Sequence, residues 1–154
     1  MKRFLLLFLL LFSVTECTFS GDETQSIDDV PNLDNELDYS IIEKSSIKWN
    51  EVFSQSEDRY IVYFYSQYCG YCRTVKQEVL SYYLTKTDVM YFLDAIKEDA
   101  IFGKNDGSLI GTKKIEELYI LGTPFILEIT DWTVTNWYAG VDSVRLYINT
   151  RLEI

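Results

Sequence analysis

The sequence predicts an α/β domain in which a central mixed sheet of about four strands is flanked by helices. An apolar run, Tyr60–Tyr65, leads into a Cys-x-x-Cys motif and then into a helical pattern. A second apolar run, Asp88–Asp94, follows that helix, and a strand, a helix and a parallel strand make a right-handed crossover unit. The strand patterns Phe125–Thr130 and Thr133–Tyr138 flank a two-residue turn and predict an antiparallel hairpin.

The length and composition fit one folded domain with an acidic surface. The chain has 154 residues, of which 47% are hydrophobic and 16% aromatic, enough for a sizeable core. Its formal net charge is −10, from 14 Lys and Arg against 24 Asp and Glu. Because nucleic acids and anionic lipids are also negative, this charge argues against either as a direct partner.

The N-terminus has the pattern of a secretory signal peptide. Lys2 and Arg3 precede an uninterrupted apolar run, Phe4–Phe12, which is well short of the ~20 residues that span a bilayer as a helix. We therefore expect residues 1–17 to form a signal peptide. The protein would then act outside the cytoplasm, either secreted or anchored at the cell surface.

A cysteine follows the apolar run at the distance typical of acylated cysteines in bacterial lipoproteins. The stretch that ends at Cys17 resembles a lipobox, although Glu16 stands where a small residue is usual. Two outcomes stay open: Cys17 carries a lipid anchor that holds the protein on a membrane without spanning it, or Cys17 is discarded with the signal.

Residues 18–39 are expected to be an acidic flexible tether, and residues 40–154 the folded domain. The tether region is rich in Asp and Glu, contains Pro31 and has few large apolar residues. It would either link an anchor to the domain or form a disordered tail.

The start of the domain carries a helical pattern. Its apolar residues between Ile41 and Phe53 fall mostly on one face, and Ser45 or Ser46 could cap a helix that runs to about Gln55. Three more elements are expected: a loop over Lys97–Thr112, a short helix over Lys113–Tyr119 and a closing helix over Val141–Leu152.

The motif Cys69-Gly70-Tyr71-Cys72 lies where the first strand passes into a helix that runs from about Gly70 to Leu84. At the mouth of that helix, unpaired N–H groups and the positive end of the dipole favour the thiolate of Cys69. Arg73, four residues after Cys69, would add a cation on the same side. Cys69 is therefore predicted to be a nucleophilic thiol.

Other interpretations of the cysteine pair fit less well. A structural zinc site needs four ligands, and the chain has no histidine and only Cys17 besides the pair. A structural disulfide between Cys69 and Cys72 would close too small a loop to remove much chain entropy. The absence of histidine also excludes Ser/His and Cys/His catalysis, and we expect no metal, nucleotide or flavin cofactor.

The order of the elements resembles the thioredoxin superfamily over about residues 40–154. The Cys69–Cys72 motif looks like its active site, and Thr123-Pro124 looks like its cis-proline loop. The resemblance implies a thioredoxin-like fold in which Cys69 attacks and the more buried Cys72 resolves. It also implies a cis Thr123–Pro124 bond beside the cysteines, with a backbone edge that binds an extended substrate peptide.

Two positions depart from the family. Tyr63 stands six residues before Cys69, where thioredoxins carry a buried Asp that is thought to assist proton transfer. Tyr71 follows Gly70 as in glutaredoxins, instead of the thioredoxin proline or the histidine of disulfide isomerases and oxidases. These residues leave the subtype within the family open.

The sequence thus indicates an extracytoplasmic thiol–disulfide oxidoreductase that reduces or isomerises protein disulfides through its dithiol. Its expected partners are protein thiols and disulfides and a redox partner protein, with no nucleic acid and with a membrane only through the N-terminal anchor. The alternative is a non-catalytic thioredoxin-fold module that binds peptides for a secretion or envelope system. Turnover of a disulfide substrate separates the two.

Overall fold

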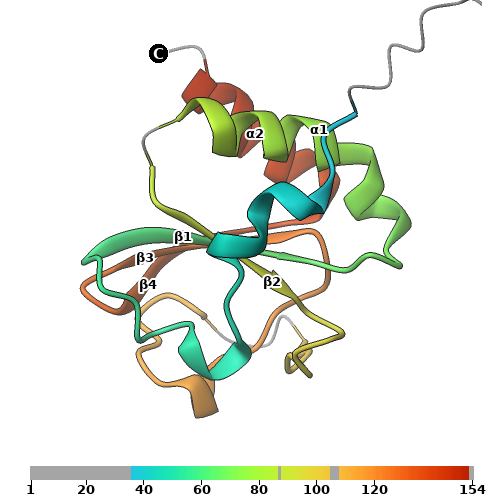
Figure 1. The fold of residues 1–154 in the computed structure, drawn as a ribbon. Coiled ribbons are helices and arrows are strands. Elements are labelled where there is room, and N and C mark those ends of the chain that lie inside the picture. The colour runs from blue at the N-terminus through green and yellow to red at the C-terminus, as the bar shows by residue number, and fades with distance from the viewer. Residues whose placement is uncertain (1–35, 87, 105–107, 153–154) are drawn as a thin grey trace, which may run out of the picture. The chain divides into compact units, whose positions relative to one another are not determined.

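The computed structural model describes residues 36–86, 88–104 and 108–152 (Figure 1). The predicted signal peptide, the lipidation candidate Cys17 and the tether as far as residue 35 lie outside the described residues.

Four strands form one mixed sheet, as the sequence predicts. Their bounds are Arg59–Tyr65 for β1, Met90–Asp94 for β2, Phe125–Thr130 for β3 and Thr133–Ala139 for β4. The order across the sheet is β2-β1-β3-β4. β1 runs parallel to β2 and antiparallel to β3, and β3 runs antiparallel to β4. The predicted crossover and hairpin are both confirmed, and the fold is thioredoxin-like.

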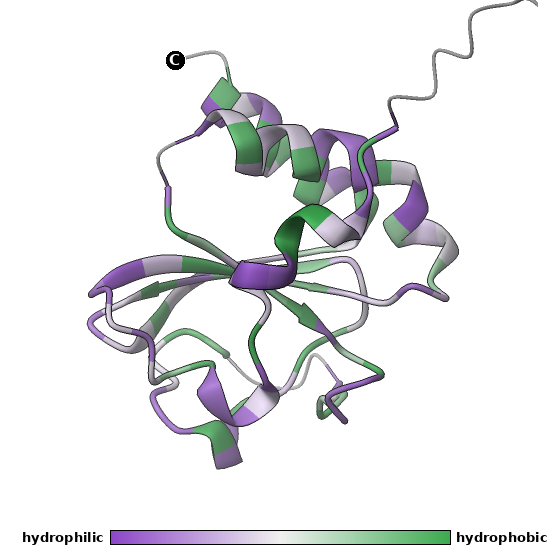
Figure 2. Cartoon of the chain, viewed as in Figure 1, coloured by the Kyte–Doolittle hydropathy of each residue, from purple (hydrophilic) through white to green (hydrophobic). Residues whose placement is uncertain are grey.

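Two α-helices cover the same face of the sheet (Figure 1). Helix α1, Gly70–Thr85, connects β1 to β2, and helix α2, Gly140–Leu152, follows β4 and packs against α1. Polar and apolar residues alternate along both helices (Figure 2), so each can turn an apolar side to the sheet. Gly140 begins α2 with φ +81°, a left-handed value that glycine adopts without strain.

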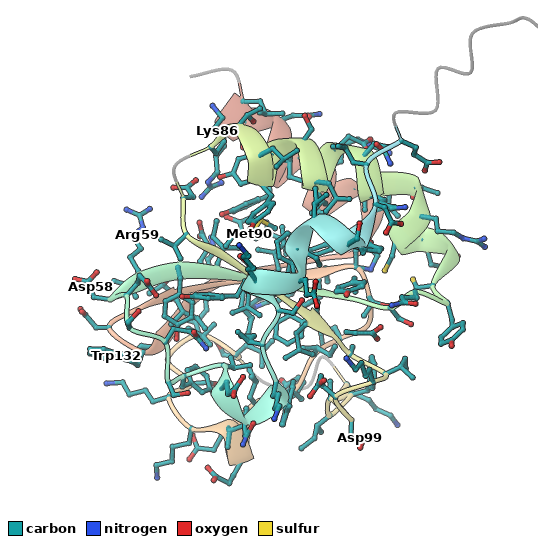
Figure 3. All side chains as sticks on the ribbon, in the orientation of Figure 1. Asp58, Arg59, Lys86, Met90, Asp99 and Trp132 are labelled. Carbon is teal, nitrogen blue, oxygen red and sulfur yellow. The ribbon has the colours of Figure 1, made fainter. Side chains whose placement is uncertain are left out.

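The hairpin turn has the backbone that the right-handed twist of the strands favours. Asp131 and Trp132 both have positive φ, 49° and 53°, as in a type I′ turn. The Trp132 indole N–H donates to the Gln55 carbonyl at 3.0 Å, and Asp131 N–H donates to the Asp58 carbonyl at 2.7 Å. Figure 3 shows Asp58 and Trp132 at the same end of the sheet.

The predicted helix up to Gln55 is wrong. The chain instead forms two short 3-10 helices, η2 over Tyr39–Ser45 and η3 over Trp49–Glu51. Between them Ser46 makes a parallel bridge to Phe92, and Ile47 N–H donates to the Phe92 carbonyl at 2.9 Å. Pairing with the free edge of β2 thus replaces the helical conformation in this segment.

The caps and the third short helix also differ from expectation. Asp38 caps η2 by accepting from Ser40 N–H at 3.0 Å, whereas Ser46 ends that helix. Lys113–Tyr119 shortens to one 3-10 turn, η4, over Ile115–Glu117. The predicted loop over Lys97–Thr112 is confirmed where it is described, with an isolated bridge from Phe102 to Ile120.

Strand β1 separates two hydrophobic clusters, one on each face of the sheet. Ile61, Tyr63 and Tyr65 point to the cluster beneath the helices, which also contains Cys72. Tyr60, Val62 and Phe64 point to the opposite cluster. The first face is covered by α1, α2 and η2, and the second by irregular segments around η3 and η4 (Figure 1). We call these the helix face and the loop face.

Candidate redox site

The two cysteines lie at the N-terminal end of α1, directly after β1. Cys69 is the N-cap residue, and its sulfur accepts a hydrogen bond from Cys72 N–H at 3.2 Å. The sequence prediction that Cys69 sits at the mouth of the helix is therefore confirmed. A backbone N–H directed at the sulfur, together with the helix dipole, stabilises negative charge there.

The loop before β3 completes the site from a distant part of the chain. The Cys69 thiol donates to the Thr123 carbonyl at 3.3 Å, although 54 positions separate the two residues. Phe125 pairs with Phe64 near the end of β1, so the residues just before β3 lie beside those just after β1. The Thr123–Pro124 peptide bond is cis, the isomer that the sequence predicts.

The two thiols differ sharply in environment. Cys72 is fully buried, with 0% of its surface exposed, whereas Cys69 is partly exposed. Burial, together with the hydrogen bond to Cys69, raises the pKa of Cys72 to about 12. Partial burial also raises the pKa of Cys69, but hydrogen bonding with the Thr123 side chain and with Cys72 outweighs it and leaves that pKa below its ordinary value. Both cysteines are in the dithiol form.

Arg73 contributes less to the lowered pKa of Cys69 than the sequence suggests. Among the described residues, the main groups that shift the pKa of Cys69 are the neighbouring hydrogen-bonding groups, and Arg73 is not one of them. Arg73 instead lines an open groove that η2, the end of β1 and the start of α1 surround, together with Tyr39, Tyr65, Gln67 and Lys76. The lowered pKa therefore has a hydrogen-bonding cause in this structure.

The surface around Cys69 is aromatic. Tyr71, between the two cysteines, is 71% exposed, and Tyr68, directly before Cys69, is 88% exposed. Gly70 begins the helix between them. An exposed thiol flanked by two exposed aromatic rings can contact the apolar part of a peptide.

Two tyrosines behind Cys72 were not predicted as site residues. Tyr63 is fully buried in the cluster that contains Cys72. Tyr39 stacks on Tyr65 with ring centroids 4.2 Å apart. The alternation of β1 could have placed Tyr63 on the same face as Tyr65, but no signal in the sequence places Tyr39, which falls in the predicted tether.

The last residues of that tether are attached to α1. Leu37 exchanges two hydrogen bonds with the Gln77 side chain, both 2.9 Å long. The Lys76 ammonium lies 3.3 Å from the Asp38 carboxylate and 5.4 Å from the centroid of the Tyr39 ring. These contacts hold Tyr39 against the helix that carries the cysteines.

The described parts of the chain show neither a metal-binding cluster nor a membrane-spanning helix. No three His, Cys, Asp or Glu residues among 36–86, 88–104 and 108–152 come together in a way that could hold a metal ion. Within the same ranges, every helix is too short or too polar to cross a bilayer.

Comparison with known proteins identifies a family match and similar structures. Residues 40–106 match the family model described as Thioredoxin. Oxidised mitochondrial thioredoxin 3 from Saccharomyces cerevisiae is 12% identical, with 70% of this chain and 92% of that chain covered and a TM-score of 0.49. Thioredoxin f2 from Chlamydomonas reinhardtii is 18% identical, with 69% and 94% covered and a TM-score of 0.46. No curated protein matches the chain.

Proposed function

We propose that the chain is a member of the thioredoxin superfamily that reduces or isomerises disulfide bonds in protein substrates through Cys69 and Cys72, because residues 40–106 match the Thioredoxin family model. The observation that carries the proposal is the contrast between the two thiols. Cys69 is accessible, has a lowered pKa and caps α1, while the buried Cys72 keeps its proton at neutral pH.

The proposed reaction has two steps. The Cys69 thiolate attacks one sulfur of the substrate disulfide, and the other substrate sulfur leaves with the electron pair and takes up a proton. Cys72 then loses its proton and attacks the Cys69 sulfur of the mixed disulfide. The Cys69–Cys72 disulfide forms, and the second substrate sulfur leaves and is protonated. The substrate gains two electrons, and the protein loses two.

The loop at Thr123 and Pro124 is the proposed site for the substrate backbone. The Thr123 carbonyl lies 3.3 Å from the Cys69 sulfur, so a peptide whose disulfide reaches Cys69 also passes this loop. An extended peptide can add to such a backbone edge through main-chain hydrogen bonds. Tyr68 and Tyr71 would contact its side chains next to the disulfide.

The proposed place of action is outside the cytoplasm. This rests on the charged and apolar pattern of Met1–Phe12. Mass spectrometry of protein from its native source should find a chain that lacks residues 1–16. An acylated Cys17 at the new N-terminus would establish the membrane anchor, and a soluble chain that starts near Thr18 would rule it out. Intact Met1 would rule out signal cleavage.

Insulin reduction in the presence of dithiothreitol tests the proposed activity. The protein should accelerate precipitation of the insulin B chain, and Cys69→Ser should be no faster than the reductant alone. If wild type and Cys69→Ser were equally inactive, the fold would serve as a binding module for peptides instead.

Equilibration with glutathione buffers tests the direction of electron flow. The chain has no histidine between its cysteines, and Arg73 is not a main contributor to the pKa of Cys69. We therefore expect a reduction potential below about −200 mV, nearer to the −270 mV of thioredoxin than to the −120 mV of a strong oxidant. A midpoint above about −150 mV would instead indicate an oxidase.

A further inference from the structure

Two tyrosine hydroxyls on the helix face are buried without a hydrogen-bond partner in the part of the chain that the structure describes. They belong to Tyr39 and Tyr63. Leaving a buried polar group unpaired costs free energy, so such groups are rare in folded proteins and call for a physical explanation. Neither hydroxyl has a role in the two steps proposed above.

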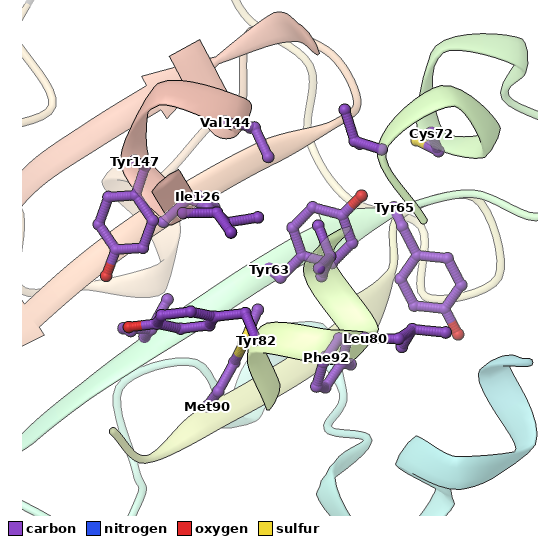
Figure 4. Packing of buried hydrophobic residues seen from close by; sticks show 14 of the residues in the cluster. Tyr63, Tyr65, Cys72, Leu80, Tyr82, Met90, Phe92, Ile126, Val144 and Tyr147 are labelled. Atoms are coloured by element: carbon purple, nitrogen blue, oxygen red, sulfur yellow. The ribbon is translucent and has the colours of Figure 1, made fainter. Parts of the chain in front are cut away.

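Both hydroxyls lie on the side of Cys72. Tyr63 projects from β1, and Figure 4 shows its hydroxyl directed toward the start of α1, where Cys72 lies. Tyr39 comes from η2 and stacks on Tyr65, whose ring is parallel to that of Tyr63 within 3° at a centroid distance of 6.2 Å. The three rings thus form a layer behind the cysteine.

The two hydroxyls and the thiols affect one another electrostatically. Burial raises the pKa of Tyr63 and of Tyr39, and negative charge on Cys72 raises both further. The two hydroxyls also interact with each other, which raises the pKa of Tyr63 and lowers that of Tyr39, as a Tyr63 hydroxyl directed toward the Tyr39 oxygen would. Their geometry nevertheless falls short of a hydrogen bond, so neither oxygen has a settled partner. Both therefore stay protonated at neutral pH, and each keeps a hydroxyl proton that can turn to an acceptor.

Cys72 needs such a donor at one moment of the reaction. Its thiol must lose a proton before it attacks the mixed disulfide, and burial opposes a thiolate there. A hydrogen bond to a charged acceptor is stronger than one between neutral groups. A neutral hydroxyl can supply that bond without placing a second charge in the core.

We propose that the Tyr63 hydroxyl donates a hydrogen bond to the Cys72 sulfur as it becomes a thiolate in the resolving step, and that Tyr39 positions the Tyr63 hydroxyl. This rests on the proposed function. The Cys72 proton passes to the solvent, and the Cys72 sulfur bonds to the Cys69 sulfur as the bond between Cys69 and the substrate sulfur breaks. The substrate sulfur departs with the electron pair of that bond and takes up a proton from the solvent. Neither tyrosine gains or loses a proton overall.

Several other titratable groups lie near this layer, among them Asp94, which raises the pKa of Tyr65, and Tyr83, which packs against the same cluster. Cys69 faces Cys72 from the same helix, and Tyr65 lies between Tyr39 and Tyr63, while Asp38 and Lys76 lie at the outer edge of Tyr39. Other tyrosines of the cluster interact chiefly with Asp88, Glu128 and Arg151 at a different part of the face; they are Tyr82, Tyr138 and Tyr147. Ile126 from β3 and Val144 from α2 do not titrate.

Reaction of the reduced protein with 5,5′-dithiobis(2-nitrobenzoic acid) separates the two steps in one stopped-flow experiment. Cys69 releases the first thionitrobenzoate, and attack by Cys72 on the resulting mixed disulfide releases the second. In Tyr63→Phe the second release should be about tenfold slower at neutral pH, as loss of a hydrogen bond to a charged group predicts. The pH at which the rate of the second release is half-maximal should rise, and the rate of the first release should be unchanged.

Further variants make the experiment decisive. Tyr39→Phe should slow the second release in the same direction by a smaller factor, and it decides the question if Tyr63→Phe does not fold. Tyr60→Phe is the matched control, since it removes a buried hydroxyl from the same strand on the loop face and should change neither release.

Two outcomes separate this inference from the proposed function. Cys72→Ser should lose the second release, and if it keeps that release, Cys72 does not resolve and the proposed function fails. If Cys72→Ser loses it while Tyr63→Phe and Tyr39→Phe match wild type in rate and pH midpoint, only the role of the hydroxyls is overturned. Equal slowing of the first release in Tyr63→Phe would also overturn it.

Discussion

The helix face and the loop face share the strand β1 but differ in cover and in chemistry. The helix face is packed by α1 and α2 and holds Cys72 with the unpartnered hydroxyls of Tyr39 and Tyr63. On the loop face, the Tyr60 hydroxyl donates to the Val52 carbonyl at 2.7 Å. Alternate residues of one strand therefore lie in different environments. Those on the helix face surround a reactive thiol, whereas on the loop face the Tyr60 hydroxyl is hydrogen-bonded and contributes to stability.

The loop face also shows how an irregular cover can pack tightly. A Cβ atom placed on Gly103 would lie 2.3 Å from the Tyr119 ring, so only glycine lets this segment approach so closely. Phe64 is fully buried there and makes edge contacts with Trp49 and Phe125. The lack of helices on this face therefore does not mean a loose core.

The largest expected effect separates reactivity from stability on the helix face. Cys69→Ser should reduce insulin reduction to the background rate, because the serine hydroxyl cannot replace the thiolate. Since Cys69 is partly exposed, the free energy of unfolding of the Cys69→Ser protein should differ from that of wild type by no more than about 0.5 kcal/mol. Urea unfolding of both proteins provides the comparison, and a large loss of stability would mean that Cys69 is a structural residue.

On the loop face, a substitution is expected to change the stability of the protein but not the reactivity of Cys69. Phe64→Ala should lower the free energy of unfolding by about 3–5 kcal/mol, because it removes a buried ring and leaves a cavity. The rate at which Cys69 reacts with 5,5′-dithiobis(2-nitrobenzoic acid) should stay the same while the variant is folded. A changed thiol rate in the folded variant would show that the two faces are coupled through β1.

Alkylation should distinguish the thiols within the helix face. At pH 7, iodoacetamide should label Cys69 at least about a hundredfold faster than Cys72, because Cys69 is exposed and its pKa is lowered, whereas the pKa of Cys72 is raised to about 12. Raising the pH from 6 should speed labelling of Cys69 until its thiolate predominates, while Cys72 stays slow. Peptide mapping that finds Cys72 labelled first would reverse the assigned roles.

The smallest expected effect compares two tyrosines of β1 directly. Tyr60→Phe should lower the free energy of unfolding by about 1 kcal/mol, because the buried Val52 carbonyl loses its donor. Tyr63→Phe removes a hydroxyl without a partner among the described residues and should cost nothing or stabilise slightly. Equal losses in thermal unfolding would show that the Tyr63 hydroxyl is paired in solution.

The elements that the sequence predicts well are those whose signal is local. β1 is a continuous apolar run, α1 has a clear helical period, and Asp131-Trp132 separates two strand patterns, so each appears within a residue or two of its predicted bounds. The contact between Cys69 and Thr123 agrees with what the family resemblance implies for the Thr123-Pro124 loop, and the pairing of β1 with β3 explains it.

The predictions that failed concern features that depend on contacts with distant residues. The segment after Tyr39 has a helical pattern, yet pairing of Ser46 with Phe92 at the edge of β2 breaks it. Tyr39 lies at the site because the hydrogen bonds between Leu37 and Gln77 hold the preceding residues against α1, and the composition of the tether does not predict these bonds. The cation of Arg73 was expected to act on Cys69, but Arg73 is not among the main groups that shift the pKa of Cys69.

The attachment of Leu37 to Gln77 has a consequence for the smallest autonomous fragment of this protein. A fragment cut at the boundary suggested by the sequence, residue 40, would lose the Gln77 hydrogen bonds, the Asp38 cap of η2 and the stacking of Tyr39 on Tyr65. A fragment that begins at residue 36 keeps all of them. The shorter fragment should melt at a lower temperature and expose the back of the cysteine helix, so four residues of apparent linker belong to the folding unit.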